Sequence, residues 1–314
     1  MKTIVLLTTS LIAACSIATA DEVTDWNQVM LKAVLTAPVT PAPVSTRVAA
    51  IVQAGVFDAV NGIDRRYTPI YVPPFGPSGA SEGAAAVQAA YANLVRLFPA
   101  QQDKFDQQRT ASLAAIKDSK SAIQAGVAWG QSVADQIWTW RSQDGFSNTV
   151  SPYLGGTQAG QWRPTPPANA PGLVPQLATT TPWVLRSPSQ FRPPGPPAMT
   201  SDQYTADFNE TKLMGSAAST SRTADQNLYA TFWQVGNPPD YWDQVATSVA
   251  AQHKFSLVQN ARVLAMVNLG IADSIIGCWD AKYTYSFWRP ITAIQLGDLD
   301  NNPATLADGG WVPL

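Results

Sequence analysis

The chain has 314 residues, of which 46% are hydrophobic and 13% are charged, and its formal net charge is −2. This composition supports a large apolar core and excludes an intrinsically disordered chain. The acidic pI, near 5.4, and the absence of a basic run argue against a nucleic-acid partner. We therefore expect a globular protein of one large domain or two smaller ones.

The first 20 residues have the pattern of an export signal. Lys2 precedes an apolar run, and the segment ends in Ala18-Thr19-Ala20, which is typical of signal-peptidase cleavage. The four residues 12–15, IAAC, also resemble a bacterial lipobox, in which Cys15 would be lipidated. We expect an exported protein, periplasmic or secreted, with a lipid anchor at Cys15 as the alternative. In either case Cys278 has no partner for a disulfide.

Apolar residues between 21 and 149 recur mostly at helical spacing, and we interpret this stretch as an N-terminal helical part. Three of the predicted helices cover residues 26–37, 81–98 and 121–145. Another begins after Pro43, with Ser45 as its N-cap, and runs toward Gly62. Short turns join them.

Residues 150–200 have a different composition. Twelve of the 25 prolines fall in this segment, so no long regular helix can form there. It also contains Trp162, Trp183 and Phe191, which a free linker would not need. We interpret the segment as an ordered loop that lies across the helical body, with a hinge between two domains as the alternative.

Helical spacing returns in residues 201–314. Thr223 with Gln226, and Ser256 with Gln259, have the spacing of capping boxes. The second box opens a long helix over 256–283 that is apolar on most sides and is expected at the centre of a bundle. Past the leader no stretch contains eighteen uncharged apolar residues, so no membrane span is expected. The fold class predicted is all-α.

Two cations lie at the end of the long helix, around four aromatic residues. Lys282 closes the helix, and Arg289 is held out of helical geometry because Pro290 follows it. In one interpretation Lys282 only interacts with the helix dipole. In the other, the mobile lysine charge and the planar arginine fork together clamp a phosphate-like oxyanion.

The spacing Lys282, six residues, Arg289-Pro290 resembles the first motif of the vanadium-dependent haloperoxidases and the related phosphatidic acid phosphatase-type phosphatases. Other segments, such as WNQVMLKAV at 26–34 and AAIVQAGVFDAVNGID at 49–64, resemble the exported haloperoxidase-like branch. The resemblance covers nearly everything from 26 to 314.

This resemblance implies an all-α helical bundle of the vanadium haloperoxidase type, with the long Pro-rich loop across it. Residues 201–314 would form the N-terminal portion of the haloperoxidase and acid-phosphatase-like helical domain. Lys282 and Arg289 would bind oxygens of vanadate, or of phosphate in the phosphatase reading, and Trp279, one turn before the lysine, would line the pocket. The implied activity is halide oxidation by hydrogen peroxide at a vanadate site, with phosphomonoester hydrolysis on the same scaffold as the alternative. The substrates would be small: halide, peroxide or phosphoester.

The sequence departs from the family downstream of Arg289. The motifs P-S-G-H and S-R-x5-H-x3-D, which carry the working histidines, do not occur there, and His253 is the single histidine of the chain. We expect His253 to be exposed or to cap a helix, and the chain to be incomplete or inactive as given. A further alternative is therefore a truncated, non-catalytic helical protein that binds an oxyanion weakly, exposes apolar surface and self-associates.

The remaining candidate groups favour structural roles. The segment DLDNNP at 298–303 begins like a calcium loop but lacks the glycine and the closing glutamate, so a plain turn is expected and no metal site. Asp273 and Asp280 are expected to cap or bridge. Cys278 is expected to be a buried helix residue without nucleophilic function.

Overall fold

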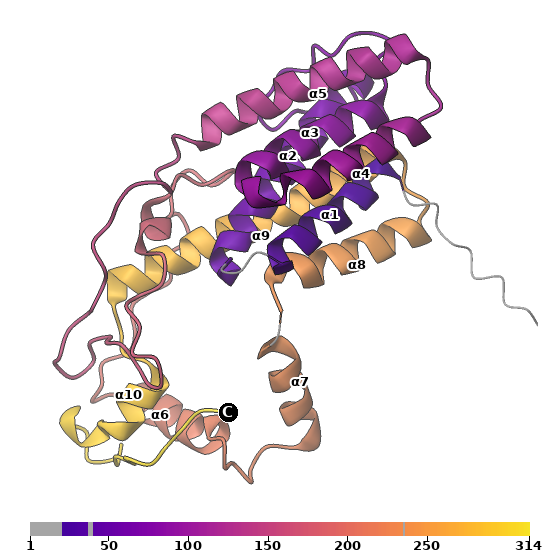
Figure 1. Ribbon diagram of the computed structural model, residues 1–314. Helices are drawn as coiled ribbons and strands as arrows, with labels where there is room; N and C mark the ends of the chain where they lie inside the picture. The colour runs from indigo at the N-terminus through magenta and orange to yellow at the C-terminus, as the bar shows by residue number, and fades with distance from the viewer. Residues whose placement is uncertain (1–20, 37–39, 235) are drawn as a thin grey trace, which may run out of the picture.

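The computed structural model describes residues 21–36, 40–234 and 236–314, so the predicted export signal at 1–20 lies outside them. In these residues the regular structure is helical, and β-pairing is limited to three isolated bridges. The helices, labelled in Figure 1, are α1 (Glu22–Thr36), α2 (Ala42–Asp64), α3 (Glu82–Leu97), α4 (Gln102–Ala115), α5 (Lys120–Arg141), α6 (Asp202–Gly215), α7 (Ala224–Gln234), α8 (Pro238–Gln252), α9 (Leu257–Tyr285) and α10 (Pro290–Gln295), with short 3-10 helices at Pro99–Gln101, Pro175–Thr179 and Gly297–Leu299. The predicted all-α class is confirmed.

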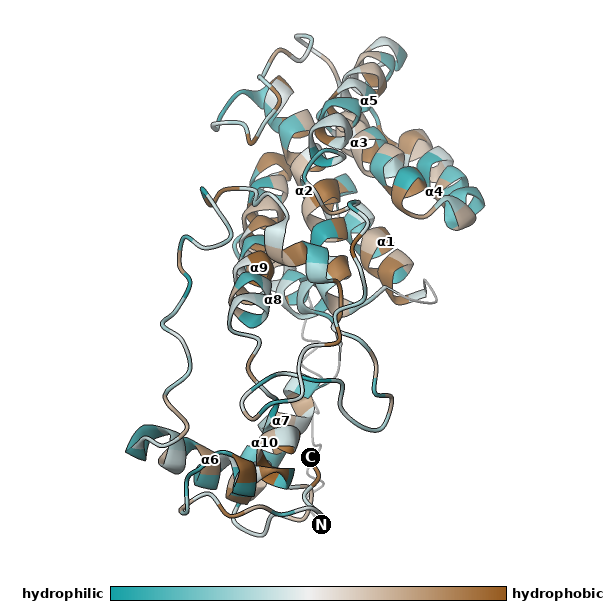
Figure 2. Ribbon diagram, turned by 90° about the vertical axis from the view of Figure 1, so that its left-hand side faces the viewer, coloured by the Kyte–Doolittle hydropathy of each residue, from teal (hydrophilic) through white to brown (hydrophobic). Residues whose placement is uncertain are grey.

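The main bundle is built around α2 and α9. Helix α2 packs against α3, α5 and α9, and α8 covers α9 from the other side. The largest core side chains that these elements bury include Trp26, Met30, Leu94, Phe105 and Leu264. Figure 2 shows hydrophobic residues in brown on α2 and α9. The predicted position of the long helix at the centre of a bundle is correct for its N-terminal two thirds.

Helix ends and close approaches follow from specific residues. Ser81 and Ser119 cap α3 and α5, each accepting a hydrogen bond from the backbone N–H three residues on at 3.2 Å. A Cβ at Gly130 in α5 would lie 2.3 Å from the Ala85 carbonyl oxygen of α3, so only glycine allows these helices to pack this closely. Both predicted capping boxes are present, at Thr223 and Ser256.

The sequence-based expectation did not name α6, α8 and α10 individually, and it differs from the structure at two further helices. Helix α2 begins at Ala42 with Pro41 as its N-cap, and Ser45 lies inside the first turn, where its hydroxyl donates to the Ala42 carbonyl. A proline in the first turn loses no hydrogen bond, so Pro43 does not delay the helix. Helix α4 was not predicted, because it is weakly amphipathic and buries only Phe105.

The Pro-rich segment is ordered and contains no regular element longer than the 3-10 helix Pro175–Thr179. Leu177 and Trp183 are buried against the helices. Asp273 of α9 accepts the backbone N–H groups of Trp183, Val184 and Leu185 at 2.6–2.9 Å and so fixes the segment on the bundle. The predicted loop across the helical body is therefore present, while the domain boundaries at 149 and 200 stay a prediction.

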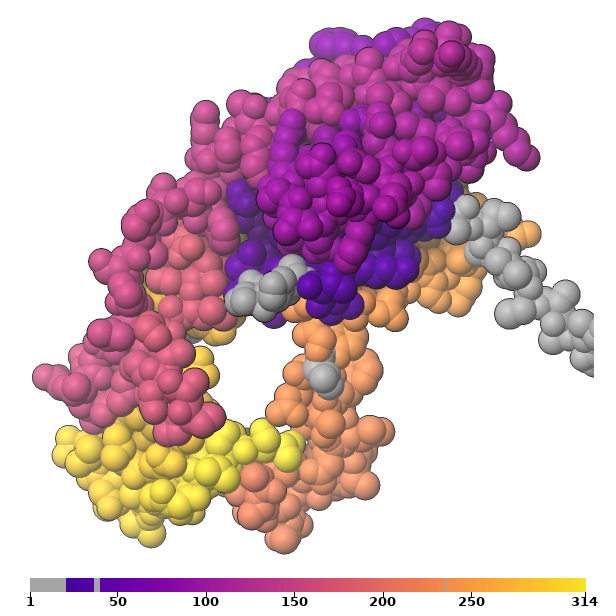
Figure 3. All heavy atoms as spheres, viewed as in Figure 1, coloured from indigo at the N-terminus to yellow at the C-terminus, as the bar shows by residue number. Residues whose placement is uncertain are grey.

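A smaller lobe lies apart from the bundle in both ribbon views (Figures 1 and 2). It contains α6, α10 and the C-terminal segment, and its core is formed chiefly by Tyr204, Phe208, Trp288, Ile294 and Trp311. The C-terminal third of α9 joins it to the bundle. Figure 3 shows an opening through the molecule between the bundle, α7 and this lobe.

Helix α9 is the one helix of the described residues that is long and apolar enough to cross a membrane by length and composition alone. Its most apolar window has a mean hydropathy of 1.5, and 44% of that window is buried. Packing against α2 and α8 accounts for the buried part of this window.

Candidate oxyanion site

The two predicted cations lie on either side of the turn between α9 and α10. Lys282 is in the last turn of α9, and the helix ends where Ser286 adopts a left-handed conformation (φ 45°) and donates its N–H to the Lys282 carbonyl. Arg289 is extended (φ −77°, ψ 156°) and is the N-cap of α10. The expectation that Pro290 holds Arg289 out of the helix is confirmed.

The Pro-rich loop holds this turn in place. The N–H of Trp162 donates to the Ser286 carbonyl at 2.7 Å, and the N–H of Trp288 donates to the Gly160 carbonyl at 2.9 Å. The Trp288 side chain is buried in the core of the small lobe. Because both sides of the turn are fixed, the backbone that carries Lys282 and Arg289 has a defined geometry.

A pocket of about 720 Å³ opens beside the turn. It brings together the three residues that the sequence singled out, Trp279, Lys282 and Arg289. Its remaining walls come from the turn itself and from the Pro-rich loop, and they comprise Tyr153, Trp162, Gly172, Leu173, Pro193, Pro194, Gly195, Pro196, Ala281, Tyr283, Tyr285, Phe287, Trp288 and Pro290.

The electrostatic character of the pocket is cationic. Its lining includes Lys282 and Arg289 but no carboxylate. The nearest acid in the sequence, Asp280, is held by Arg192 through two hydrogen bonds of 2.6 and 2.7 Å. Within 21–36, 40–234 and 236–314, the side chains of Lys282 and Arg289 form no ion pair or hydrogen bond with the protein. Both are exposed, so both charges are available to an anion from solvent.

Trp279 links the lysine to the loop. The Lys282 ammonium lies 4.2 Å from the centroid of the Trp279 ring, a cation–π contact. The indole N–H donates to the Leu173 carbonyl at 2.9 Å. Burial raises the pKa of the neighbouring Tyr283, the adjacent Tyr153 raises it further, and Arg289 opposes the shift. Tyr283 is therefore a neutral phenol at neutral pH.

The candidate groups without an expected chemical role, apart from Cys278, have the predicted structure. His253 is exposed and caps the C-terminus of α8. The segment 298–303 is a turn in which Asp300 accepts from the Asn302 N–H and the Thr305 hydroxyl, and no metal-ligand cluster occurs in the part of the chain that the structure describes. As expected, Asp273 caps the Pro-rich loop by accepting the Trp183 N–H, and Asp280 bridges to Arg192.

The prediction for Cys278 is wrong. Its thiol is free and exposed rather than buried. Beyond Ile276, α9 extends past the bundle, so residues on its outer side face solvent although the helix is apolar (Figure 1).

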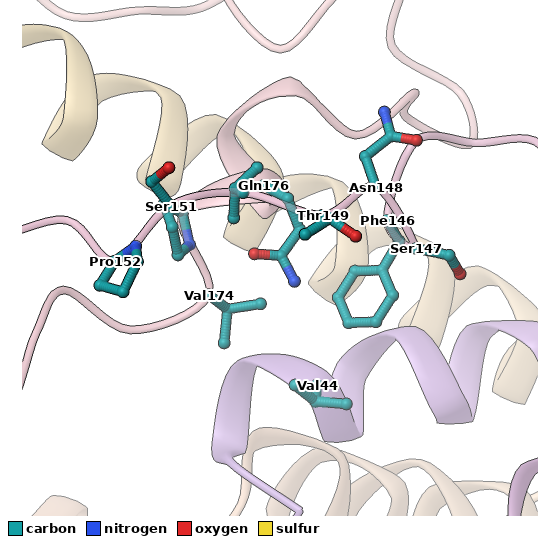
Figure 4. Close-up of a pocket in the computed structure, with 11 residues that line it drawn as sticks. Val44, Phe146, Ser147, Asn148, Thr149, Ser151, Pro152, Val174 and Gln176 are labelled. Carbon is teal, nitrogen blue, oxygen red and sulfur yellow. The ribbon is translucent and has the colours of Figure 1, made fainter.

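A second pocket, of about 570 Å³, lies between the start of α2 and the Pro-rich loop (Figure 4). Its lining runs over Val44, residues 146–152 and residues 174–176, and none of these side chains is titratable. It offers hydroxyl and amide groups but no charged side chain and no acid or base that could activate a hydroxyl.

The sequence did not identify the loop residues that complete the cationic pocket. Tyr153 and Trp162 reach the pocket from more than 100 residues before Lys282. The only sequence signal was the unusual number of aromatic residues in a Pro-rich segment. This signal indicates that the segment is buried, but it does not indicate which part of the molecule the segment packs against.

The fold and the pocket together define an all-helical bundle protein with a cationic, aromatic-lined pocket at the end of its central helix. Residues 262–314 match a family model described as the VCPO second helical-bundle domain. A stretch of 111 residues is 27% identical to the vanadium chloroperoxidase of Curvularia inaequalis, and this match covers 31% of the present chain and 18% of that relative.

Solved structures show the same fold. The crystal structure of a bacterial vanadium-dependent iodoperoxidase superposes with a TM-score of 0.76 at 22% identity, covering 87% of this chain and 71% of that one. A holo-type bacterial vanadium-dependent chloroperoxidase superposes with a TM-score of 0.66 at 17% identity, covering 84% and 67%. The chain therefore shares the fold of vanadium haloperoxidases, and the segment that matches the family model contains the motif at Lys282 and Arg289.

Proposed function

We propose that this chain is a vanadate-dependent haloperoxidase-like protein whose Lys282 and Arg289 bind the oxyanion. The observation that carries the proposal is that these two cations line one pocket without a carboxylate in its wall. An ammonium and a guanidinium without protein partners match the charge and the oxygen-rich surface of a tetrahedral anion, so the residues present fit vanadate or phosphate.

In this proposal each residue has a separate task. Arg289 directs its planar fork at two oxygens of the anion, and Lys282 adds a point charge whose direction is limited by its contact with Trp279. Vanadate, when bound, supplies the Lewis-acid activation of hydrogen peroxide that halide oxidation requires.

A second candidate function is oxyanion binding without catalysis. The position of the single histidine, His253, favours it. His253 precedes α9, whereas Lys282 is near its other end. At a rise of 1.5 Å per residue, about 40 Å separates them. A histidine at that distance cannot act as the nucleophile of a phosphatase or as an acid or base for bound peroxide.

The first experiment measures vanadate and phosphate binding to the full chain by calorimetry. We expect the two anions to compete for one site, and Arg289→Ala and Lys282→Ala each to weaken binding at least tenfold, since each removes a charge-assisted contact. Arg186→Ala, which removes an exposed arginine that does not line the pocket, is the matched control. Unchanged affinity in both pocket variants would exclude this site.

The second experiment assays halide oxidation with hydrogen peroxide. If the chain is catalytic, the rate should depend on added vanadate and fall with excess phosphate. Oxyanion binding that depends on Arg289, without vanadate-dependent halide oxidation, would favour the non-catalytic candidate. Hydrolysis of a phosphomonoester that vanadate inhibits would favour the phosphatase.

We also propose that the protein is exported and self-associates. The aromatic face of α7 supports self-association, because Leu228, Phe232 and Trp233 are each more than half exposed. Light scattering after size exclusion should give a mass above 33.6 kDa, and a monomer at all concentrations would contradict it. An intact-mass measurement of the protein from its host would show cleavage after residue 20 or lipidation at Cys15.

A further inference from the structure

The pocket is much larger than a tetrahedral oxyanion. Its volume is about 720 Å³, whereas an anion of four oxygens needs on the order of 100 Å³, a few times the roughly 30 Å³ share of a water molecule in the liquid. Most of the space next to Lys282 and Arg289 is therefore available to something else. Its size is that of the concave sites that take small organic ligands.

The walls around this space are mainly aromatic. Seven of the lining residues have aromatic side chains: Tyr153, Trp162, Trp279, Tyr283, Tyr285, Phe287 and Trp288. Tyr153 is at the centre of one wall, edge-on to Tyr283 with ring centroids 4.9 Å apart and tilted against Trp162 at 5.4 Å. An additional ring in the pocket would extend this arrangement.

The hydroxyl groups of the three tyrosines in this wall are already engaged. Tyr283 donates its hydroxyl proton to the Leu173 carbonyl at 2.9 Å, and Tyr285 donates to the Pro193 carbonyl at 2.5 Å. The Tyr153 hydroxyl forms a hydrogen bond with the Ser286 hydroxyl. What these residues present to a ligand is ring surface held in a fixed orientation, which favours another aromatic ring over a polar group.

Close packing maintains this wall. A Cβ at Gly172 would lie 2.7 Å from the Tyr283 hydroxyl oxygen and 3.0 Å from the Tyr153 ring. The loop thus reaches both tyrosines only because glycine is present there. The rings are positioned before any ligand arrives, which lowers the entropic cost of binding.

We infer that the pocket recognises an aromatic ring placed directly beside the oxyanion, with Tyr153, Tyr283 and Tyr285 as the principal contacts of the ring. The inference deepens the proposed function and depends on it for the position of the anion. Two sources share this chemistry: the ring can be joined to the oxyanion, as in an aryl phosphate, or it can be a separate neutral compound such as a phenol that binds next to the anion.

The test compares phenyl phosphate with methyl phosphate by calorimetry on the full chain. Since an aromatic contact adds affinity beyond that of its buried area, we expect phenyl phosphate to bind about tenfold more tightly. Tyr153→Leu should remove most of this preference, whereas Tyr153→Phe, which keeps the ring, should retain it. Tyr229→Leu, at an exposed tyrosine of α7 outside the pocket, is the control. Equal affinities for the two esters, or a preference that survives Tyr153→Leu, would overturn the inference.

A second measurement separates this inference from the proposed function. Phenol binding is followed by ligand-observed NMR with and without saturating phosphate. Phenol that binds to wild type and Tyr153→Phe but not to Tyr153→Leu supports the aromatic site even if phosphate does not bind, which would reject the oxyanion proposal alone. Absence of phenol binding together with equal ester affinities would reject the aromatic site alone. Phenol binding that phosphate leaves unchanged identifies a separate aromatic compound, and a preference confined to phenyl phosphate identifies a joined one.

Discussion

Two cationic clusters of this molecule differ in what their charges contact. At the end of α5, Arg141 is buried, donates to Asp144 at 2.9 Å and to the Thr181 carbonyl at 2.7 Å, and lies 4.1 Å above the Trp183 ring. Arg47 donates to the same carboxylate at 3.0 Å. At the end of α9, Lys282 and Arg289 line an open pocket whose wall contains no carboxylate. The first cluster is satisfied by the protein and fixes the Pro-rich loop, whereas the second leaves its charges to a ligand.

The largest expected effect comes from removing the carboxylate of the buried cluster. Asp144→Ala leaves two arginines without their counter-ion, and breaking a buried pair in this way costs about 3–5 kcal/mol. Urea unfolding should show the loss. Arg289→Ala should change the free energy of unfolding by less than about 0.5 kcal/mol, as expected for an exposed side chain. A comparable loss in both variants would mean that Arg289 is also structural.

Asp243 in α8 is a buried acid of the opposite kind, with amide neighbours instead of a cation. Burial raises its pKa to about 7 from an ordinary 3.8, and the hydrogen bond from Asn268 opposes the shift. The folded chain therefore holds a proton that the unfolded chain releases. The protonated Asp243 carboxyl makes its full contribution to the free energy of unfolding below about pH 4. This contribution is lost as the pH rises through about 7, a change on the order of 4 kcal/mol.

Asp243→Asn tests this pH dependence. The variant should lose less stability than wild type between pH 4.5 and pH 8 in urea unfolding, because it has no carboxyl group to ionise. Asp207→Asn, at an exposed acid of α6, should keep the wild-type profile. Parallel profiles for wild type and Asp243→Asn would show that this carboxyl is ionised in the folded chain.

Arg289→Lys sharpens the comparison at the open cluster. It keeps the charge but removes the planar fork, so vanadate or phosphate affinity should fall about tenfold, the loss of one charge-assisted hydrogen bond of about 1.5 kcal/mol. Calorimetry measures this directly. Affinity equal to wild type would indicate that Arg289 acts only as a point charge.

The smallest effect is expected at the far end of α9. Ser256→Ala removes the capping box and should lower the free energy of unfolding by about 1 kcal/mol. Since the cap lies about 40 Å from Lys282 along the helix, oxyanion affinity should stay unchanged. A matching loss of affinity would show that the end of α9 transmits strain to the pocket.

Much of the fold could be predicted from local patterns. Periodicity placed α1, α3, α5 and α9, and the capping boxes at Thr223 and Ser256 marked the starts of α7 and α9, because capping depends on residues within one turn. The sequence does not predict α4, because this helix has little amphipathic pattern. The prediction of Ser45 as an N-cap is wrong because α2 begins earlier, with prolines in its first turn. The exposure of Cys278 depends on where α9 leaves the bundle, which no local pattern encodes.

The sequence by itself determined the helical class, a motif that resembles the vanadium haloperoxidases, and the two cations of that motif, because these depend on residue type and on spacings of fewer than ten positions. Only the tertiary structure decided that Trp279, Lys282 and Arg289 share one pocket, and that Tyr153 and Trp162 complete it. The reason is the long irregular loop. Its path is set by contacts such as Asp273 with the Trp183 N–H and Trp162 with the Ser286 carbonyl, which join positions far apart in the chain.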